Sequence, residues 1–155
     1  MKFIKYIFLT LLIFSCDDDS DLIDAGTSEL QGSWSGSMIN MSDPNIFTFT
    51  FTDNNFELNG LVYNMYDSTN VIPVIGSGTF TINNQLAPNE MDIIITSYEV
   101  AGQPVIEYSD LTSLCIYQIE GDTLSFSGAE PGTSQRPTNF TGNEGGMQVY
   151  LLIRN

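Results

Sequence analysis

Histidine is missing from this chain of 155 residues, and cations are scarce, because four lysines and arginines stand against 19 aspartates and glutamates. The absence of histidine excludes a Ser-His-Asp triad, a Cys-His dyad and a histidine-based zinc site. The excess of acidic residues disfavours binding to nucleic acid or to anionic membrane surfaces. Apolar residues still make up 42% of the chain and aromatic residues 12%, which favours a packed core over a disordered acidic chain.

Two of the four cations, Lys2 and Lys5, precede a short apolar run over residues 6–14. The run is shorter than the roughly 20 residues that span a bilayer. A basic start, a short apolar centre and a small residue before a cut are typical of a secretory signal. We therefore expect residues 1–15 to be a signal peptide, with a buried helix as the alternative. Without it, two cations face 19 anions, a net charge of −17.

The end of this segment, IFSC at residues 13–16, resembles the lipobox of bacterial lipoproteins. The resemblance implies that Cys16 becomes the first residue and carries acyl chains, such as palmitate, which anchor it in a membrane. Aspartates 17–19 resemble the surface-export signal of Bacteroidota lipoproteins, although an aspartate after the cysteine can mark inner-membrane retention in other Gram-negative bacteria. We expect a surface-exposed outer-membrane lipoprotein in which residues 16–29 form an acidic tether.

The remaining chemistry of the sequence points away from catalysis. With Cys16 lipidated, Cys115 has no partner for a disulfide, and its apolar neighbours indicate a buried, inert thiol. The acidic run 17–24 is not an EF-hand loop, because Leu22 and Ser28 stand where glycine and glutamate are needed. No pair of carboxylates has a setting recognisable from glycosidases. We expect no enzyme, no cofactor and no metal site.

After residue 30 the sequence repeatedly alternates between apolar and polar residues, which is typical of strands. In residues 47–52, three phenylalanines share one face and three threonines the other. Turn residues follow, so residues 46–62 are predicted to form a hairpin. About eight strands with closely spaced turns predict an all-β antiparallel sandwich or barrel over residues 30–155. The other predicted strands are 33–41, 77–82, 91–96, 114–119, 123–127 and 147–153.

A short helical turn expected at residues 27–31 leads into G-S-W, which ends at Trp34, and Arg154 stands at the end of the chain. This arrangement resembles the lipocalins. The resemblance implies a single antiparallel up-and-down β-barrel of about eight strands, in which Trp34 plugs the closed end and Arg154 stacks on its ring. The order LQGSW, GTFTI, MDIIIT, IYQIEGDTLSFS, QRPTNF and VYLLIR also resembles a small bacterial lipocalin-like domain over about residues 30–154. Residues 64–75 fit that pattern poorly.

The resemblance implies a barrel interior that holds a small apolar ligand. The same bulky side chains can instead fill a barrel of this size, which would leave a non-enzymatic structural or interaction module at the cell surface. A neutral ligand is expected, because the acidic exterior repels anions unless Arg136 lies at the mouth. The predicted interior face consists of Phe47, Phe49, Phe51, Met91, Ile93 and Ile95.

Arg136 has two interpretations. It binds an anionic ligand at the rim, or it pairs with Glu130 or Glu144 and holds the long loop 128–146 in place; we favour the second. Four tyrosines are expected in or near loops, where they are scattered or form a rim for sugars or proteins. These are Tyr63, Tyr66, Tyr98 and Tyr108.

Overall fold

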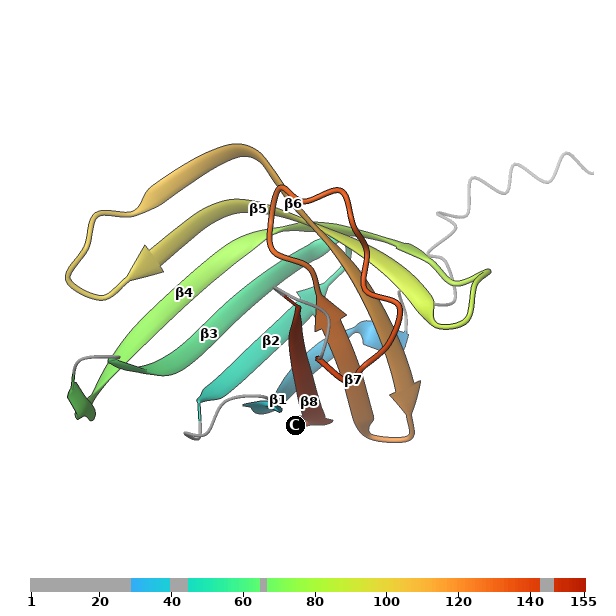
Figure 1. Cartoon of the computed structure of the whole chain (residues 1–155), viewed down its shortest axis with the longest axis horizontal. Coiled ribbons are helices and arrows are strands. Elements are labelled where there is room, and N and C mark those ends of the chain that lie inside the picture. The colour runs from blue at the N-terminus through green and yellow to red at the C-terminus, as the bar shows by residue number, and fades with distance from the viewer. Residues whose placement is uncertain (1–28, 40–44, 65–66, 143–146) are drawn as a thin grey trace, which may run out of the picture.

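The computed structural model describes residues 29–39, 45–64, 67–142 and 147–155. Eight antiparallel strands run up and down around one closed barrel, each paired with the next, and the last strand returns to pair with the first (Figure 1). The predicted all-β, lipocalin-like barrel of eight strands is confirmed. The strands are β1 (Gly32–Met38), β2 (Ile46–Thr52), β3 (Asn55–Asn64), β4 (Asp67–Asn83), β5 (Asn89–Val100), β6 (Ile106–Glu120), β7 (Thr123–Gly128) and β8 (Gln148–Arg154).

The middle strands are longer than the sequence pattern predicts. Strand β4 has 17 residues, so residues 67–75 belong to a strand, although the resemblance left this segment in doubt. The alternation of apolar and polar residues is not visible in this part of β4. Ile75, which is exposed, is apolar and large, whereas Gly76, which points inward, has no side chain. At the start of the barrel, β1 ends at Met38 rather than at residue 41.

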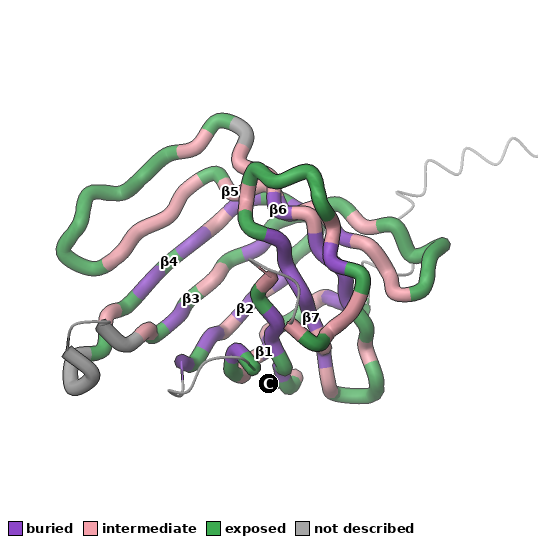
Figure 2. The backbone as a smooth tube through the Cα atoms, viewed as in Figure 1, coloured by how far each residue is buried: buried purple, intermediate pink, exposed green. Residues whose placement is uncertain are grey.

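Side chains alternate between the inside and the outside of the barrel, as the pattern in β2 predicts. Phe47, Phe49 and Phe51 are at most 5% exposed, whereas the threonines between them lie on the outer face. Figure 2 shows the same alternation of buried and more exposed positions along the neighbouring strands. A slip of one residue would turn every phenylalanine outward, so this alternation fixes the register of β2.

Two glycines allow strands to approach closely. A Cβ on Gly36 would collide with the carbonyl oxygen of Leu151, where β1 meets β8. A Cβ on Gly60 would lie 2.7 Å from both the Phe47 ring and the Val74 side chain, inside the barrel. The first glycine helps to close the barrel at the seam, and the second makes room for an aromatic ring.

The loop after β7 passes in front of β6 and β7 (Figure 1). Its backbone N–H groups at Ala129 and Gly132 donate to the carbonyls of Leu114 and Thr112, at 3.0 and 2.8 Å. These bonds continue the edge of β6 beyond its pairing with β7. Outward-facing Ile116 is only 2% exposed. The first part of the loop thus extends the sheet beside β6.

Candidate functional site

Trp34 closes one end of the barrel and is fully buried. Its indole N–H donates to the carbonyl of Leu30, at 2.8 Å, which fixes the helical turn beneath the ring. The guanidinium carbon of Arg154 lies 4.0 Å from the centroid of the Trp34 ring. The two residues that the sequence suggested as a plug are therefore in contact, from the first and the last strand.

Arg154 also ties this end to the segment that precedes β1. Its two terminal nitrogens donate to the carbonyls of Gln31 and Glu29, at 2.9 and 2.8 Å. The side chain of Gln31 exchanges two hydrogen bonds with the backbone of Asp53, at 3.0 and 2.8 Å. We call this sealed region the closed end. Its polar groups form hydrogen bonds with one another.

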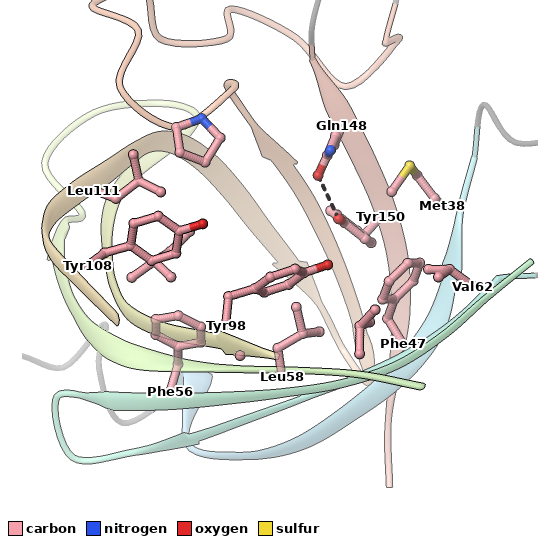
Figure 3. A pocket seen from close by; sticks show the side chains of 14 residues that line it. Met38, Phe47, Phe56, Leu58, Val62, Tyr98, Tyr108, Leu111, Gln148 and Tyr150 are labelled. Atoms are coloured by element: carbon pink, nitrogen blue, oxygen red, sulfur yellow. Dashed lines mark hydrogen bonds between the residues drawn. The ribbon is translucent and has the colours of Figure 1, made fainter. Parts of the chain in front are cut away.

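The opposite half of the barrel contains a cavity of about 350 Å³ (Figure 3). This volume exceeds the approximately 300 Å³ at which small-molecule pockets begin. The lining is mainly aliphatic and aromatic and comes from the inward positions of the strands. The lining residues are Met38, Phe47, Phe56, Leu58, Val62, Val74, Gly76, Ile95, Tyr98, Tyr108, Leu111, Pro131, Gln148 and Tyr150. We call this half the cavity end.

A layer of aromatic rings separates the cavity from the plug. The rings of Phe47, Phe49 and Phe126 surround that of Tyr150, with centroids 5.2, 5.3 and 5.6 Å away. The edge-to-face geometry of the first two pairs is favourable for aromatic rings. Below this layer the barrel is packed, so the cavity has a rigid floor.

Three tyrosines supply polar groups to this apolar space. Tyr98 and Tyr108 extend into it from β5 and β6, and the Tyr150 hydroxyl donates to the Gln148 side-chain oxygen at 2.8 Å (Figure 3). Burial raises the pKa of Tyr98, with a smaller effect from the neighbouring Tyr108, and burial likewise raises the pKa of Tyr150. Both hydroxyls are therefore neutral at physiological pH. No aspartate, glutamate, lysine or arginine lines the cavity in the described part of the chain.

The predicted interior residues divide between cavity and core. Phe47 and Ile95 line the main cavity, and a smaller space of about 90 Å³ beside it is lined by Phe49, Ile93 and Ile95, among others. Phe51 and Met91 line neither and are packed at 1% exposure. They lie below the aromatic layer and belong to the packed core, so they do not contribute to the lining of either space.

Arg136 does not line the cavity. Its guanidinium forms ion pairs with Asp92 and, at 3.5 Å, with Glu90 on the outer face of β5, rather than with Glu130. It also donates to the carbonyls of Met91 and Cys115, at 3.0 and 2.6 Å. The other expected partner, at position 144, lies outside the described residues. Arg136 thus fastens the loop to strands that are remote in sequence, which spacing alone does not reveal.

The cavity tyrosines lie in strands, close to the loop that joins β5 to β6. Tyr98 is two residues before the end of β5, and Tyr108 is two residues after the start of β6. A bulge at Thr96 shifts the register of β5, so that Ile95 and Tyr98 both point inward although they are three positions apart. A strict alternation from Ile93 and Ile95 would instead have placed position 97 inside. Of the other two, Tyr63 is in β3 and Tyr66 lies outside the described residues.

Cys115 is fully buried in the core. Burial raises the pKa of its thiol to about 12, and a hydrogen bond with Ser113 offsets this only in part. The thiol is therefore protonated at neutral pH and lacks the thiolate that nucleophilic chemistry needs. Cys16, the expected lipidation site, lies outside the described residues. Among the described residues no three histidine, cysteine, aspartate or glutamate side chains gather as a metal site.

Comparison of the chain with family models, with curated proteins and with solved structures finds no match. In the described ranges, no helix is long and apolar enough to cross a membrane. What the protein does must therefore be argued from the geometry of its cavity.

Proposed function

We propose that this chain is an exported, lipid-anchored, non-enzymatic protein whose barrel binds one small, neutral, apolar ligand. The observation that carries the proposal is the cavity of about 350 Å³ with an uncharged lining. A purely structural module would be expected to fill its barrel with side chains. Here the inward position Gly76, which lines the cavity, carries no side chain.

The lining selects against charged ligands. A carboxylate buried there would lose its hydration without gaining a cationic partner, which is costly. Arg136 cannot supply that partner, because it is engaged by two carboxylates on the outer face. The net charge of −17 expected after signal removal would also repel anions at long range. A neutral molecule is therefore favoured over a fatty acid.

The tyrosines define the polar part of the ligand. Since the Tyr150 hydroxyl donates to Gln148, its oxygen remains able to accept a hydrogen bond from a ligand. The hydroxyl of Tyr98 can either donate or accept. The ligand we expect is a mainly apolar molecule with one hydroxyl or carbonyl group, bound with a Kd of order 1 μM, about 8 kcal/mol.

Fluorescence titration at low salt with a neutral apolar probe and an anionic analogue of equal size tests the proposal. The neutral probe should bind more tightly. Tighter binding of the anionic probe would contradict the charge argument, and absence of binding by either would favour a module without a ligand. Mass spectrometry of lipid extracted from the purified protein then identifies what it carries.

A substitution at Gly76 tests whether the ligand binds in this cavity. A Cβ at this position meets Leu58 and Tyr98 at 3.6 Å, an ordinary contact, so Gly76→Val should fold and project its methyl groups toward the cavity. We expect at least a tenfold loss of affinity for the neutral probe. Thr79→Val is the matched control, since it adds a valine on the exposed outer face of the same strand. Equal affinity in both variants would exclude this cavity as the site.

The anchor is proposed from the sequence motif that ends at Cys16. Several acyl chains on one residue anchor firmly, since each buried CH₂ contributes about 0.8 kcal/mol. Replacement of Cys16 by alanine should move the protein from the detergent phase to the aqueous phase in phase partitioning. A Cys16→Ala protein that still partitions with detergent would refute the lipoprotein assignment.

A further inference from the structure

Exposed aliphatic side chains form a continuous row across the outside of five neighbouring strands. Strand pairing places Leu151 of β8 beside Ser37 of β1, which lies beside Ile46 of β2. The same row continues through Leu61 of β3 to Pro73 of β4. The row contains four apolar residues and one serine, and all of them point away from the core.

The next row toward the closed end adds two more aliphatic side chains. Ile153 of β8 lies beside Ser35 of β1, and Ile75 of β4 lies three strands beyond Ser35, across Thr48 and Asn59. Large aliphatic side chains in these two rows are 44 to 53% exposed. We call this surface the aliphatic face; its large members are Ile46, Leu61, Ile75, Leu151 and Ile153. The serines of β1 separate its β8 members from those of β2 to β4. Exposed apolar surface gathered on one side of a protein is typical of an interaction surface.

The aliphatic face is also free of charge, in a chain dominated by carboxylates. No described outward side chain of β8, β1 or β2 is charged, and Glu57 of β3 lies one row further toward the closed end. The outer positions of β5 contrast with this, because they carry Glu90, Asp92 and Glu99. Acidic side chains therefore lie on the β5 side of the barrel and are absent from the described outward positions of β8, β1 and β2.

We propose that the aliphatic face binds the same face of a second copy of this chain. Two acidic copies repel each other, so they can meet closely only where neither carries charge. A basic partner would find no carboxylate among the members of this face to pair with. A membrane surface is a poorer fit, because interfacial binding uses aromatic and basic side chains and the aliphatic face has neither.

Hydroxyl groups in and beside the second row of the face are paired within one molecule. Ser35 and Thr48 share a hydrogen bond of 2.9 Å, and the side-chain amide of Asn155 donates to Ser33 and Ser35 at 2.9 Å. Burial against another copy would therefore leave few unsatisfied polar groups. Two sheets pack face to face at about 10 Å when small and aliphatic side chains interdigitate. A twofold axis makes such an interface self-complementary.

Sedimentation equilibrium of the full chain carrying Cys16→Ala tests the proposal without a lipid anchor. We expect a reversible dimer whose dissociation constant falls as salt rises from 20 to 500 mM, because salt screens the repulsion. The double variant Ile46→Asp, Leu61→Asp should raise the dissociation constant at least tenfold. Far-UV circular dichroism checks that this variant remains folded; if it does not, Leu151→Asp replaces it.

Val105→Asp and Leu86→Asp are matched controls, because these aliphatic residues are 51 and 49% exposed but lie in turns outside the face. They should dimerise like the parent chain. A monomer at all concentrations and salts, or equal weakening by the controls, would overturn the proposal. A monomer that co-sediments with vesicles of neutral phosphatidylcholine would assign the face to the membrane instead. Ligand titration is measured separately, so either proposal can fail alone.

Discussion

The two ends of the barrel are built from the same eight strands but have opposite character. At the closed end, Trp34 is fully buried, and its neighbours satisfy one another's hydrogen bonds. At the cavity end, Gly76 occupies an inward position, and the surrounding side chains leave a space of about 350 Å³. The strand topology is the same in both halves of the barrel. The size of the inward side chains therefore determines which half stabilises the fold and which half has room for a ligand.

The largest effect is expected from removal of the plug. Trp34→Ala removes the largest fully buried side chain and a hydrogen bond to Leu30, and should lower the free energy of unfolding by about 3–5 kcal/mol. Such a loss approaches the whole stability of a marginal domain. Urea denaturation followed by circular dichroism measures it. A loss below about 1 kcal/mol would mean that the closed end does not carry the stability of the barrel.

Truncation of the arginine tests how the closed end is held. Arg154→Ala removes the contact with the Trp34 ring and two hydrogen bonds to carbonyls, and should cost about 2 kcal/mol of unfolding free energy. Arg154→Lys keeps the charge but loses the planar fork, so it should recover only part of the loss. Full recovery by lysine would show that charge alone matters. Ligand affinity should stay unchanged in both variants.

Alkaline pH should weaken the region between the two ends. Burial raises the folded-state pKa of Cys115 from its ordinary value of 9.0 to about 12, so its contribution to stability is complete below pH 9 and is lost as the pH rises toward 12. Tyr150, whose pKa is also raised, adds a loss that begins near pH 10. Each group contributes a slope of at most about 1.4 kcal/mol per pH unit. Cys115→Ala should reduce this slope in denaturation measured from pH 8 to 11; an unchanged slope would contradict the assignment.

The smallest effect is expected at the cavity end. Tyr98→Phe removes one hydroxyl from the lining and keeps the ring, so affinity for a ligand with a hydrogen-bonding group should fall about threefold to tenfold. The free energy of unfolding should change by less than about 0.5 kcal/mol. Probe titration and urea denaturation of the same sample separate these effects. A large loss of stability would place Tyr98 in the core rather than in a binding site.

The fold was predictable because its signals are local. The alternation of phenylalanine and threonine in residues 47–52 fixes one strand and its buried face without knowledge of the rest. The pairing of Trp34 with Arg154 was suggested by resemblance rather than by periodicity. The extent of β4 was not predictable, because Pro73 and two glycines interrupt its pattern and its outer face is itself apolar.

The candidate site was predicted only in part. Alternation shows that Phe47 and Phe51 point inward, but it does not show how far along the barrel axis each one lies, and that depth separates cavity from core. The bulge at Thr96 changes which residues of β5 point inward, so the alternation before it does not predict that Tyr98 lines the cavity. The contact of Arg136 with β5 depends on the path of a loop. The depth of a residue along the barrel axis, the alternation of β5 after its bulge and the path of the loop all depend on the closed barrel. They cannot be predicted from a short segment of sequence.

The position of the single tryptophan determines what can be seen by spectroscopy. Trp34 is the chain's only indole and lies in the closed end, beneath the aromatic layer around Tyr150 and against a guanidinium group. The emission of Trp34 therefore reports whether the closed end is folded. Exposure of the indole to water on unfolding should shift that emission to longer wavelength. A ligand that enters the cavity stays on the far side of this layer. Selectively excited tryptophan emission thus reports unfolding and is insensitive to ligand binding, so unfolding and binding can be followed independently in one sample.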